Sequence, residues 1–213
     1  KVEPQHDGSE AVTAYRWDVR DRLREVRLPD GRRAVYRYDA FARRVSKEVH
    51  PASTLREDLA RAVARTGGVL PAERTRFLWD GDVLCAELRA AGVRVHVHEA
   101  GSFTPRLQVE QGEVLTVVND HLGMPKELVD GRGRVAWAAA HSAWGRVVEV
   151  QRDEGAAEVA SPFRLLGQYA DEETGLCYTR FRYFDAEAGR WCSPDPLGLL
   201  GGKNLAGWCG SPT

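Results

Sequence analysis

The sequence predicts an all-β protein, built as a curved sheet of hairpins with one short inserted helix. The tetrapeptide YRWD at residues 15–18 returns as YRYD at residues 36–39, and in each copy an arginine follows the aspartate four residues later. Alternation along this unit places its two aromatic rings on one face of a strand and its charges on the other. The turn sequence Pro-Asp-Gly at residues 29–31 then joins two strands into a hairpin. A hairpin unit of 21 residues, the spacing between the two copies, cannot bury its apolar face alone. We therefore expect successive units to stack side by side.

Two weaker copies of the unit follow, FLWDG at residues 77–81 and RYFD at residues 182–185. The segment before the third copy has apolar residues at helical spacing, between a Ser-Thr N-cap and a Gly-Gly stop. We therefore expect a short helix near residues 53–66, inserted between two hairpins and packed on the surface. A helix that binds a partner is the alternative.

A cleanly alternating stretch at residues 93–99 predicts a further strand, with His96 and His98 on the same face. Two histidines at this spacing can bind a metal ion, but the neighbouring Glu99 points to the opposite face. We therefore expect a pair of solvent-facing side chains and no metal site.

The charge balance argues against a basic binding surface. The chain carries 30 basic and 31 acidic residues, a net charge of −1, so no basic excess favours nucleic acid or an anionic membrane. No apolar run approaches the roughly 20 residues of a membrane span, and no signal peptide is recognised. Because the chain begins with Lys1, we expect it to be a piece of a longer protein. The cysteines form no Cys-x-x-Cys pair and are expected to be reduced thiols: Cys85, Cys177, Cys192 and Cys209.

The repeated unit resembles the YD repeat, also called the Rhs repeat, of bacterial polymorphic toxins, whose pattern is Y-x-Y-D-x-x-G-R. The second copy, residues 36–43, matches both tyrosines, the aspartate and the arginine. It departs at Ala42, which stands where the pattern has glycine, and the first copy carries Asp21 at that place.

A segment farther along is similar to the family's D-H-L-G-T-P-R-E-L motif. Residues 120–128 read DHLGMPKEL, with Met and Lys in place of Thr and Arg. Asp120 and His121 could suggest a catalytic pair, but no serine or cysteine nucleophile accompanies them in a known local signature. We expect both to be turn residues. Residues 151–161 are polar and small, which predicts a loop leading into the next block.

The most specific resemblance covers residues 162–205. Residues 164–176 are similar to the family's R-F-Q-G-Q-Y-x-D-x-E-T-G-L, residues 178–185 resemble Y-N-R-x-R-Y-Y-D-P, and SPDPLGL follows. The resemblance implies the Rhs repeat-associated core, which ends a β-shell, the YD-repeat cocoon, before a toxin segment. It divides the chain into degenerate YD-repeat hairpins (1–110), a DHLG-type segment (111–161) and the core (162–213).

Members of this family are thought to cut themselves before the toxin with two aspartates, each in a D-P-x-G-L motif. Two close carboxylates cannot both ionise, so one can hold a proton while the other activates water. Asp195 matches the first motif, and the second aspartate would fall beyond Thr213. The resemblance also suggests that Arg190 orients a carboxylate through charge-assisted hydrogen bonds. The alternative is structural, because Ser-Pro-Asp-Pro-Leu-Gly is a favourable turn sequence.

The resemblance implies a shell segment that encloses a C-terminal toxin, keeps it inactive and helps a bacterial secretion system, such as type VI, to deliver it. The implied partners are that toxin, in the same or a cleaved chain, the rest of the Rhs shell, and a secretion spike or chaperone. No nucleic acid, membrane, metal or cofactor is implied. The protein would reside in the bacterial cytoplasm before export and act outside the cell. Two alternatives stay open: half of an aspartic autoprotease, and a carbohydrate- or surface-binding module.

Overall fold

The computed structural model describes residues 1–4, 10–52 and 72–207. It divides into two compact units, Lys1–Arg76 and Phe77–Thr213, and both consist mainly of β-strands, which confirms the all-β class. The helix expected near residues 53–66 lies outside the described residues. A search of the described part finds no helix long and apolar enough to cross a membrane.

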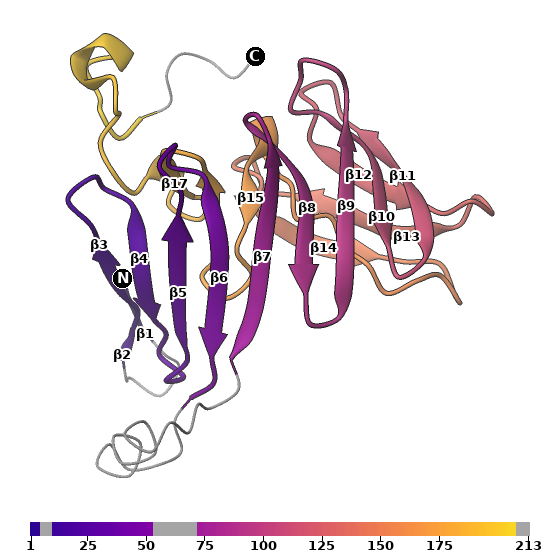
Figure 1. The fold of residues 1–213 in the computed structure, drawn as a ribbon, viewed down its shortest axis with the longest axis horizontal. Helices are drawn as coiled ribbons and strands as arrows, with labels where there is room; N and C mark the ends of the chain where they lie inside the picture. The colour runs from indigo at the N-terminus through magenta and orange to yellow at the C-terminus, as the bar shows by residue number, and fades with distance from the viewer. Residues whose placement is uncertain (5–9, 53–71, 208–213) are drawn as a thin grey trace. The chain divides into compact units, whose positions relative to one another are not determined.

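The first unit is an antiparallel meander in which each strand pairs with the next along the chain (Figure 1). Its strands are β3 (Ala14–Trp17), β4 (Leu23–Arg27), β5 (Arg33–Tyr38), β6 (Arg44–His50) and the first residues of β7 (Glu73–Asp80). A separate ribbon pairs β1 (Val2–Pro4) with β2 (Glu10–Val12). Alternation fills the core from one face of the sheet, where the fully buried apolar side chains are Leu23, Val26, Ala34 and Tyr36.

The second unit contains a longer meander and a smaller sheet of four short strands (Figure 1). After the end of β7, the meander consists of β8 (Val83–Arg89), β9 (Gly92–His98), β10 (Pro105–Glu110), β11 (Glu113–Asn119), β12 (Pro125–Val129), β13 (Val135–His141) and β14 (Val147–Gln151). The smaller sheet consists of β15 (Tyr169–Ala170), β16 (Leu176–Thr179), β17 (Arg182–Asp185) and β18 (Arg190–Trp191). Two short 3-10 turns accompany it, η1 (Leu165–Gly167) and η2 (Gly198–Gly201).

The loop expected at residues 151–161 covers part of the larger sheet. It begins after Gln151, the last residue of β14. Val159 of this loop is buried in a cluster with Leu115, Leu128 and Trp137, which come from β11, β12 and β13. Burial of this kind contributes about 1.5–3 kcal/mol to folding for each large apolar side chain. The loop therefore fixes the path of the chain into the core block, the segment that starts at residue 162.

The turn after each of the first two repeat copies explains why an aspartate and an arginine recur four residues apart. Asp39 Oδ1 accepts hydrogen bonds from the backbone amides of Phe41 and Arg43, both at 2.9 Å. Its Oδ2 accepts a hydrogen bond from Arg43 Nε at 2.7 Å. The aspartate therefore closes the turn on the backbone and the arginine locks its second oxygen. The same geometry is present in two other turns, Asp18 with Arg22 and Asp130 with Arg134.

Ala42 occupies the position in this turn where the repeat pattern has glycine, and its φ of 63° lies in the left-handed region. A β-carbon there costs about 1–2 kcal/mol, whereas glycine costs about 0.4–1 kcal/mol through the greater freedom of the unfolded chain. We expect Ala42→Gly to raise the free energy of unfolding by roughly 0.5–1 kcal/mol, measured by urea denaturation. Gly133→Ala is the reciprocal change, since Gly133 has a φ of 80° in the equivalent turn, and it should lower that free energy. Equal stabilities of all three proteins would contradict the argument.

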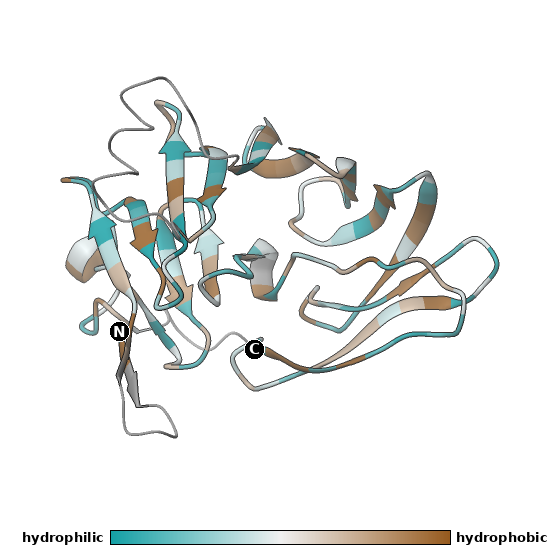
Figure 2. Cartoon of the chain, turned by 90° about the horizontal axis from the view of Figure 1, so that it is seen from below, coloured by the Kyte–Doolittle hydropathy of each residue, from teal (hydrophilic) through white to brown (hydrophobic). Residues whose placement is uncertain are grey.

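The histidines of β9 do not face solvent as a pair, contrary to the expectation from the sequence. His96 and His98 share a face, as predicted, but His96 is 3% exposed, while Val93 and Val95 on the opposite face are 53% and 36% exposed. The polar face is the buried one because the Phe163 ring covers both histidines, with centroids 4.6 and 5.2 Å away. Figure 2 shows hydrophilic and hydrophobic residues alternating within single strands, so the alternation itself does not reveal which face is covered.

Candidate functional site

Asp195 lies in the turn after β18 and holds that turn with its backbone and its side chain. Its Oδ1 accepts a hydrogen bond from the Leu197 amide at 2.8 Å. Its carbonyl accepts one from the Gly198 amide at 2.8 Å, and its own amide donates to the Leu205 carbonyl at 3.0 Å. The turn predicted for this Ser-Pro-Asp-Pro sequence is therefore present.

The arginine beside Asp195 is Arg182 of β17. Its Nη1 lies 3.1 Å from Asp195 Oδ2, and the two side chains are 13% and 5% exposed. The contact is an ion pair, because Nη1 makes no hydrogen bond within the described residues. The guanidinium also lies over the Trp191 ring, with Cζ 4.1 Å from the centroid, a cation–π contact. Arg190 is an exposed residue of β18 whose register partner is Asp185.

Gly201 lies directly against the Asp195 carboxylate. A β-carbon at this position would come within 2.6 Å of the Cγ and the Oδ2 of Asp195. The Gly-Leu-Leu-Gly-Gly run therefore serves close packing against the carboxylate. An adjacent arginine favours the ionised form of a carboxylate. Asp195 is thus placed to accept a proton or a hydrogen bond, and a second carboxyl group would have to supply the acid.

A buried network of charges lies on the polar face of β8, β9 and β10, and sequence reasoning missed it. Glu87 is fully buried; its Oε1 pairs with His96 Nε2 at 2.8 Å, and its Oε2 accepts a hydrogen bond from the Tyr169 hydroxyl at 2.8 Å. Arg94 Nη1 is 3.4 Å from Glu87 Oε1. Arg94 also donates from Nε and Nη2 to Glu110, at 2.7 and 3.1 Å. Each carboxylate thus meets a guanidinium, which is what burial of charge requires.

The electrostatics of the network keep Glu87 ionised. Burial alone would raise the pKa of Glu87, but the His96 hydrogen bond and the Arg94 charge outweigh it and lower the pKa to about 2. Burial also lowers the pKa of His96, although Glu87 opposes that effect. The imidazole is therefore neutral near pH 7 and donates its Nε2 proton to Glu87, while Arg94 supplies the positive charge.

Tyr169 connects this network to the core block. It belongs to β15, and its hydroxyl reaches Glu87 of β8 across 82 residues of sequence. Gln108 of β10 makes a second link, because its Nε2 donates to Glu110 at 2.9 Å and to the Ala160 carbonyl at 3.2 Å. Buried polar contacts thus fix the segment around residues 160–170 on the strands. The sequence signal for this network is the charged residues at alternate positions of the strands. The same pattern equally predicts a face exposed to solvent.

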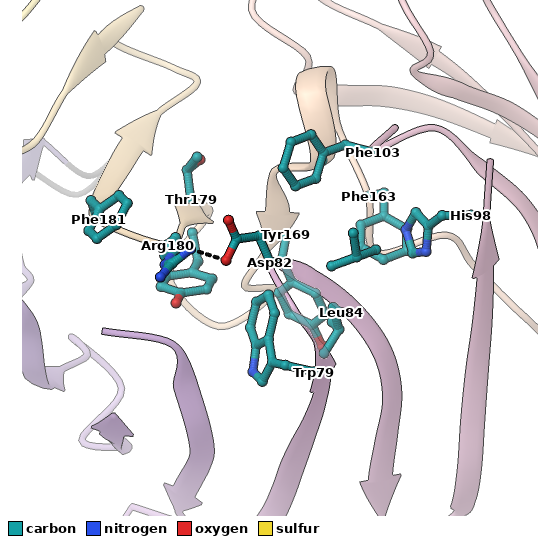
Figure 3. A pocket seen from close by; sticks show the side chains of 13 residues that line it. Trp79, Asp82, Leu84, His98, Phe103, Phe163, Tyr169, Thr179, Arg180 and Phe181 are labelled. Carbon is teal, nitrogen blue, oxygen red and sulfur yellow. Dashed lines mark hydrogen bonds and ion pairs between the residues drawn. The ribbon is translucent and has the colours of Figure 1, made fainter. Parts of the chain in front are cut away.

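A pocket of about 230 Å³ opens beside Tyr169 (Figure 3). Asp82 and Arg180 form an ion pair at this pocket, drawn as a dashed line in the figure. Most of the other large side chains around it are apolar or aromatic and come from the strands, their turns and the core block: Trp79, Leu84, Phe103, Phe163, Tyr178 and Phe181.

The remaining sequence predictions concern turns, metals and thiols. Asp120 Oδ1 accepts the amides of Leu122 and Met124 at 2.9 and 3.0 Å, and His121 is exposed, so the turn prediction is confirmed. Among residues 1–4, 10–52 and 72–207, no group of three or more His, Cys, Asp or Glu side chains could hold a metal ion. Free thiols in this part of the chain are Cys85, Cys177 and Cys192, and burial raises the pKa of Cys177 to about 12. Cys209 lies outside the described residues.

Comparisons with known proteins give a consistent set of matches. The family model described as RHS Repeat matches residues 17–54, and the one described as RHS protein matches residues 117–151. Double-stranded DNA deaminase toxin A of Burkholderia cenocepacia is 34% identical over 226 aligned residues, which cover 96% of this chain and 15% of that protein. Toxin protein Tse5 of Pseudomonas aeruginosa is 39% identical, over 82% of this chain and 14% of its own length. Probable deoxyribonuclease RhsA of Dickeya dadantii is 34% identical, over 94% of this chain and 13% of its own length.

The chain therefore spans only 13–15% of the length of these relatives. Among solved structures, a Photorhabdus luminescens Tc holotoxin pore matches with a TM-score of 0.68 and 20% identity, over 94% of this chain and 10% of that one. The complex TcdB2-TccC3-Cdc42 matches with a TM-score of 0.66 and 21% identity, again over 94% and 10%. These structural matches show a shared fold.

Proposed function

We propose, because the chain belongs to the Rhs polymorphic toxin family, that it is a structural segment of a shell that encloses a toxin and helps to deliver it. The observation that carries this proposal is the diversity of the relatives. One is described as a DNA deaminase toxin and another as a probable deoxyribonuclease, yet both share this segment at 34% identity. Proteins described by different activities have this segment in common, so it is best assigned to the apparatus that they share.

The fold supports a wall of the shell. Antiparallel strands joined by short turns satisfy the backbone hydrogen bonds along each meander, and the hydrogen bond from the Tyr169 hydroxyl to buried Glu87 joins the core block to the meander of the second unit. The meander of the second unit ends at β14, where Val148 and Val150 are 54% and 50% exposed. An edge strand with apolar side chains associates readily with another strand. We assign this edge to pairing with the rest of the shell.

The partners follow from this role. The enclosed toxin is the C-terminal part of the same or a cleaved chain, and the rest of the Rhs shell completes the enclosure. Export through a type VI system, with a secretion spike or a chaperone as partner and the bacterial cytoplasm as the place of assembly, belongs to the same proposal.

Limited proteolysis of the full-length protein tests the enclosure. The toxin segment should resist trypsin in the intact protein and become sensitive when Glu87→Ala loosens the second unit. Glu99→Ala is the matched control, because Glu99 is half-exposed and pairs with Arg106 at the surface. A toxin segment digested equally fast in wild type and in Glu87→Ala would rule out enclosure by this segment.

The position of Asp195 supports a second proposal, that it is one carboxylate of a self-cleavage pair. Its carboxylate is 5% exposed, fixed by an amide and an arginine, and lies at the end of the core block. Asp195→Asn keeps an oxygen for the Leu197 amide but removes the carboxylate, so cleavage in the full-length protein should slow by about 100-fold or more. The measurement is the cleavage product on a denaturing gel over time. Unchanged processing would leave Asp195 with a turn role only.

The two arginines of the block can be separated in the same assay. Arg182→Ala removes the ion pair with Asp195 and should slow cleavage, with a shift in its pH dependence, because the charge that favours the ionised carboxylate is gone. Arg190→Ala tests the supporting role suggested for that residue. A slower rate with Arg190→Ala would assign it to the site, and a wild-type rate would remove it.

A further inference from the structure

A group of leucines is exposed to solvent directly after Asp195. Three of them lie within a span of four residues and are 65%, 79% and 92% exposed: Leu197, Leu199 and Leu200. Single apolar side chains scattered over a surface are normal, whereas neighbouring ones that stay exposed together mark an interaction site. The turn itself does not require them, because proline, glycine and aspartate supply its geometry. The leucines therefore have a use beyond the turn.

The 3-10 turn η2 sorts these side chains onto different sides. In such a turn, residues three apart are eclipsed, and the Leu200 amide donates to the Leu197 carbonyl at 3.2 Å. Leu197 and Leu200 therefore lie on one side, and we call this pair the leucine ridge. Gly201 lies on a second side, which packs on Asp195, because a β-carbon there would come within 2.6 Å of the carboxylate. Leu199 lies on the third side.

Hydrogen bonds hold the leucine ridge at a fixed place beside the carboxylate. The Leu197 amide donates to Asp195 Oδ1, and the Gly198 amide donates to the Asp195 carbonyl, both at 2.8 Å. Successive residues of an extended chain are only about 3.3 Å apart. A peptide bond that reaches this carboxylate therefore brings the side chains on either side of it next to the leucine ridge.

The path of the chain leads from this turn back to Asp195. The Leu205 carbonyl accepts a hydrogen bond from the Asp195 amide, and the Ala206 carbonyl accepts one from the Trp191 amide, both at 3.0 Å. In the full-length protein, the downstream segment, which is the part between residue 207 and the toxin, therefore starts beside the carboxylate. A segment tethered at this point has a high effective concentration at the leucine ridge.

We propose that the leucine ridge binds an apolar side chain of the downstream segment, next to the peptide bond that is cut. This inference rests on the proposed self-cleavage. In the cut, Asp195 takes a proton from water, the hydroxyl adds to the carbonyl carbon, and the second carboxyl group gives its proton to the departing nitrogen. The ridge takes part in none of these transfers. It positions the bond against the carboxylate and selects for an apolar residue beside it.

The rate of self-cleavage in the full-length protein measures the contribution of the leucine ridge. Leu200→Ala shortens an exposed side chain, so urea denaturation should be unchanged, while cleavage should slow roughly tenfold or more. Leu200→Met keeps the apolar volume and should cleave at nearly the wild-type rate. Leu199→Ala is the matched control, because Leu199 is a leucine of the same turn, equally free of burial but on another side. Its rate should equal that of the wild type.

The outcomes separate the leucine ridge from self-cleavage itself. Equal slowing by Leu199→Ala and Leu200→Ala would overturn the assignment of the ridge. So would a wild-type rate in Leu200→Ala when Asp195→Asn stops the cut, and this result would leave self-cleavage intact. A wild-type protein that is not cut at all would instead count against self-cleavage.

A crosslinking experiment identifies the occupant without requiring the cut. Photoreactive p-benzoylphenylalanine replaces Leu200 in the full-length Asp195→Asn protein, and the crosslinked peptides are mapped by mass spectrometry. Val19, which is exposed in a turn of the first unit, is the control position. Crosslinks from position 200 to the downstream segment, absent from position 19, would support the proposal. Crosslinks only to the toxin or to other parts of the shell, or none at all, would overturn it.

Discussion

Glu87→Ala is expected to lower the free energy of unfolding by about 3–5 kcal/mol. The substitution removes the acceptor of the His96 and Tyr169 hydrogen bonds and one of the two carboxylates near Arg94. These groups are buried, so each bears a desolvation penalty once its partner is removed. The measured quantity is the midpoint and slope of urea denaturation, with the slope expected to stay constant.

The loss of stability should depend on the burial of the glutamate and not on its charge. Glu99→Ala also removes a glutamate that pairs with an arginine, at 3.0 Å from Arg106, but both of these side chains are about half-exposed. Surface ion pairs contribute about 0–1 kcal/mol, so this variant should stay within 1 kcal/mol of the wild type. Similar losses in the two variants would show that the Glu87 network does not stabilise the protein in the way described.

The class of fold followed directly from local sequence patterns. The recurring Asp and Arg, four residues apart, predicted turns, and Asp39 with Arg43 shows that this spacing lets one carboxylate bind two amides and a guanidinium. Such contacts are short in sequence, so the sequence contains all the parts needed to predict them. The same holds for Asp195, whose turn is formed by its immediate neighbours.

The buried network could not be predicted in this way, because its contacts join distant strands. Period-two alternation places Arg94 and His96 on one face, but it does not state whether that face is covered. Hydrophobicity favoured burial of Val93 and Val95, whereas the structure buries the opposite face, where Glu87 supplies the partner charge. Only the register of β8 on β9 brings these charges together.

The arginine at Asp195 illustrates the same limit within the core block. The block contains several arginines close in sequence, and a resemblance singled out Arg190. The hairpin of β16 and β17 and the path of the chain after β18 place the Arg182 guanidinium beside the carboxylate, and the role suggested for Arg190 stays a prediction. Its stacking on Trp191 is also a contact between strands. Sequence spacing cannot supply this information, because it depends on strand register.

Lowering the pH from 7 to 4 is expected to destabilise the second unit through its partly buried histidines. Burial lowers the pKa of His98 to about 4, and the neighbouring His96 acts in the same direction. Burial, with Lys126 and Arg164 nearby, lowers the pKa of His141 to about 4 as well. Both side chains bind a proton more readily in the unfolded chain, where the pKa of histidine is about 6.5.

The sign of the effect follows from this difference in proton binding. The contribution of each histidine to stability is complete above pH 6.5, declines as the pH falls toward 4, and is lost below that. Partial exposure to solvent reduces the effect, so we expect a loss of roughly 1–2 kcal/mol for each of His98 and His141. The contribution of Glu87 to stability also declines as the pH falls, but over a lower range, because its pKa of about 2 lies below its unfolded value of about 4.5. Its contribution is therefore lost between pH 4.5 and 2, after that of the histidines.

Urea denaturation at pH 7, 5.5 and 4 separates these contributions. His98→Gln cannot take up a proton, so it should reduce the loss between pH 7 and 4 by roughly 1–2 kcal/mol. His121→Gln is the control, since it makes the same substitution at a histidine that is exposed in the turn after β11. A wild-type stability that is equal at pH 7 and pH 4 would contradict the placement of these rings. A histidine covered by Phe163 can be protonated only at a cost in free energy that the unfolded chain does not bear.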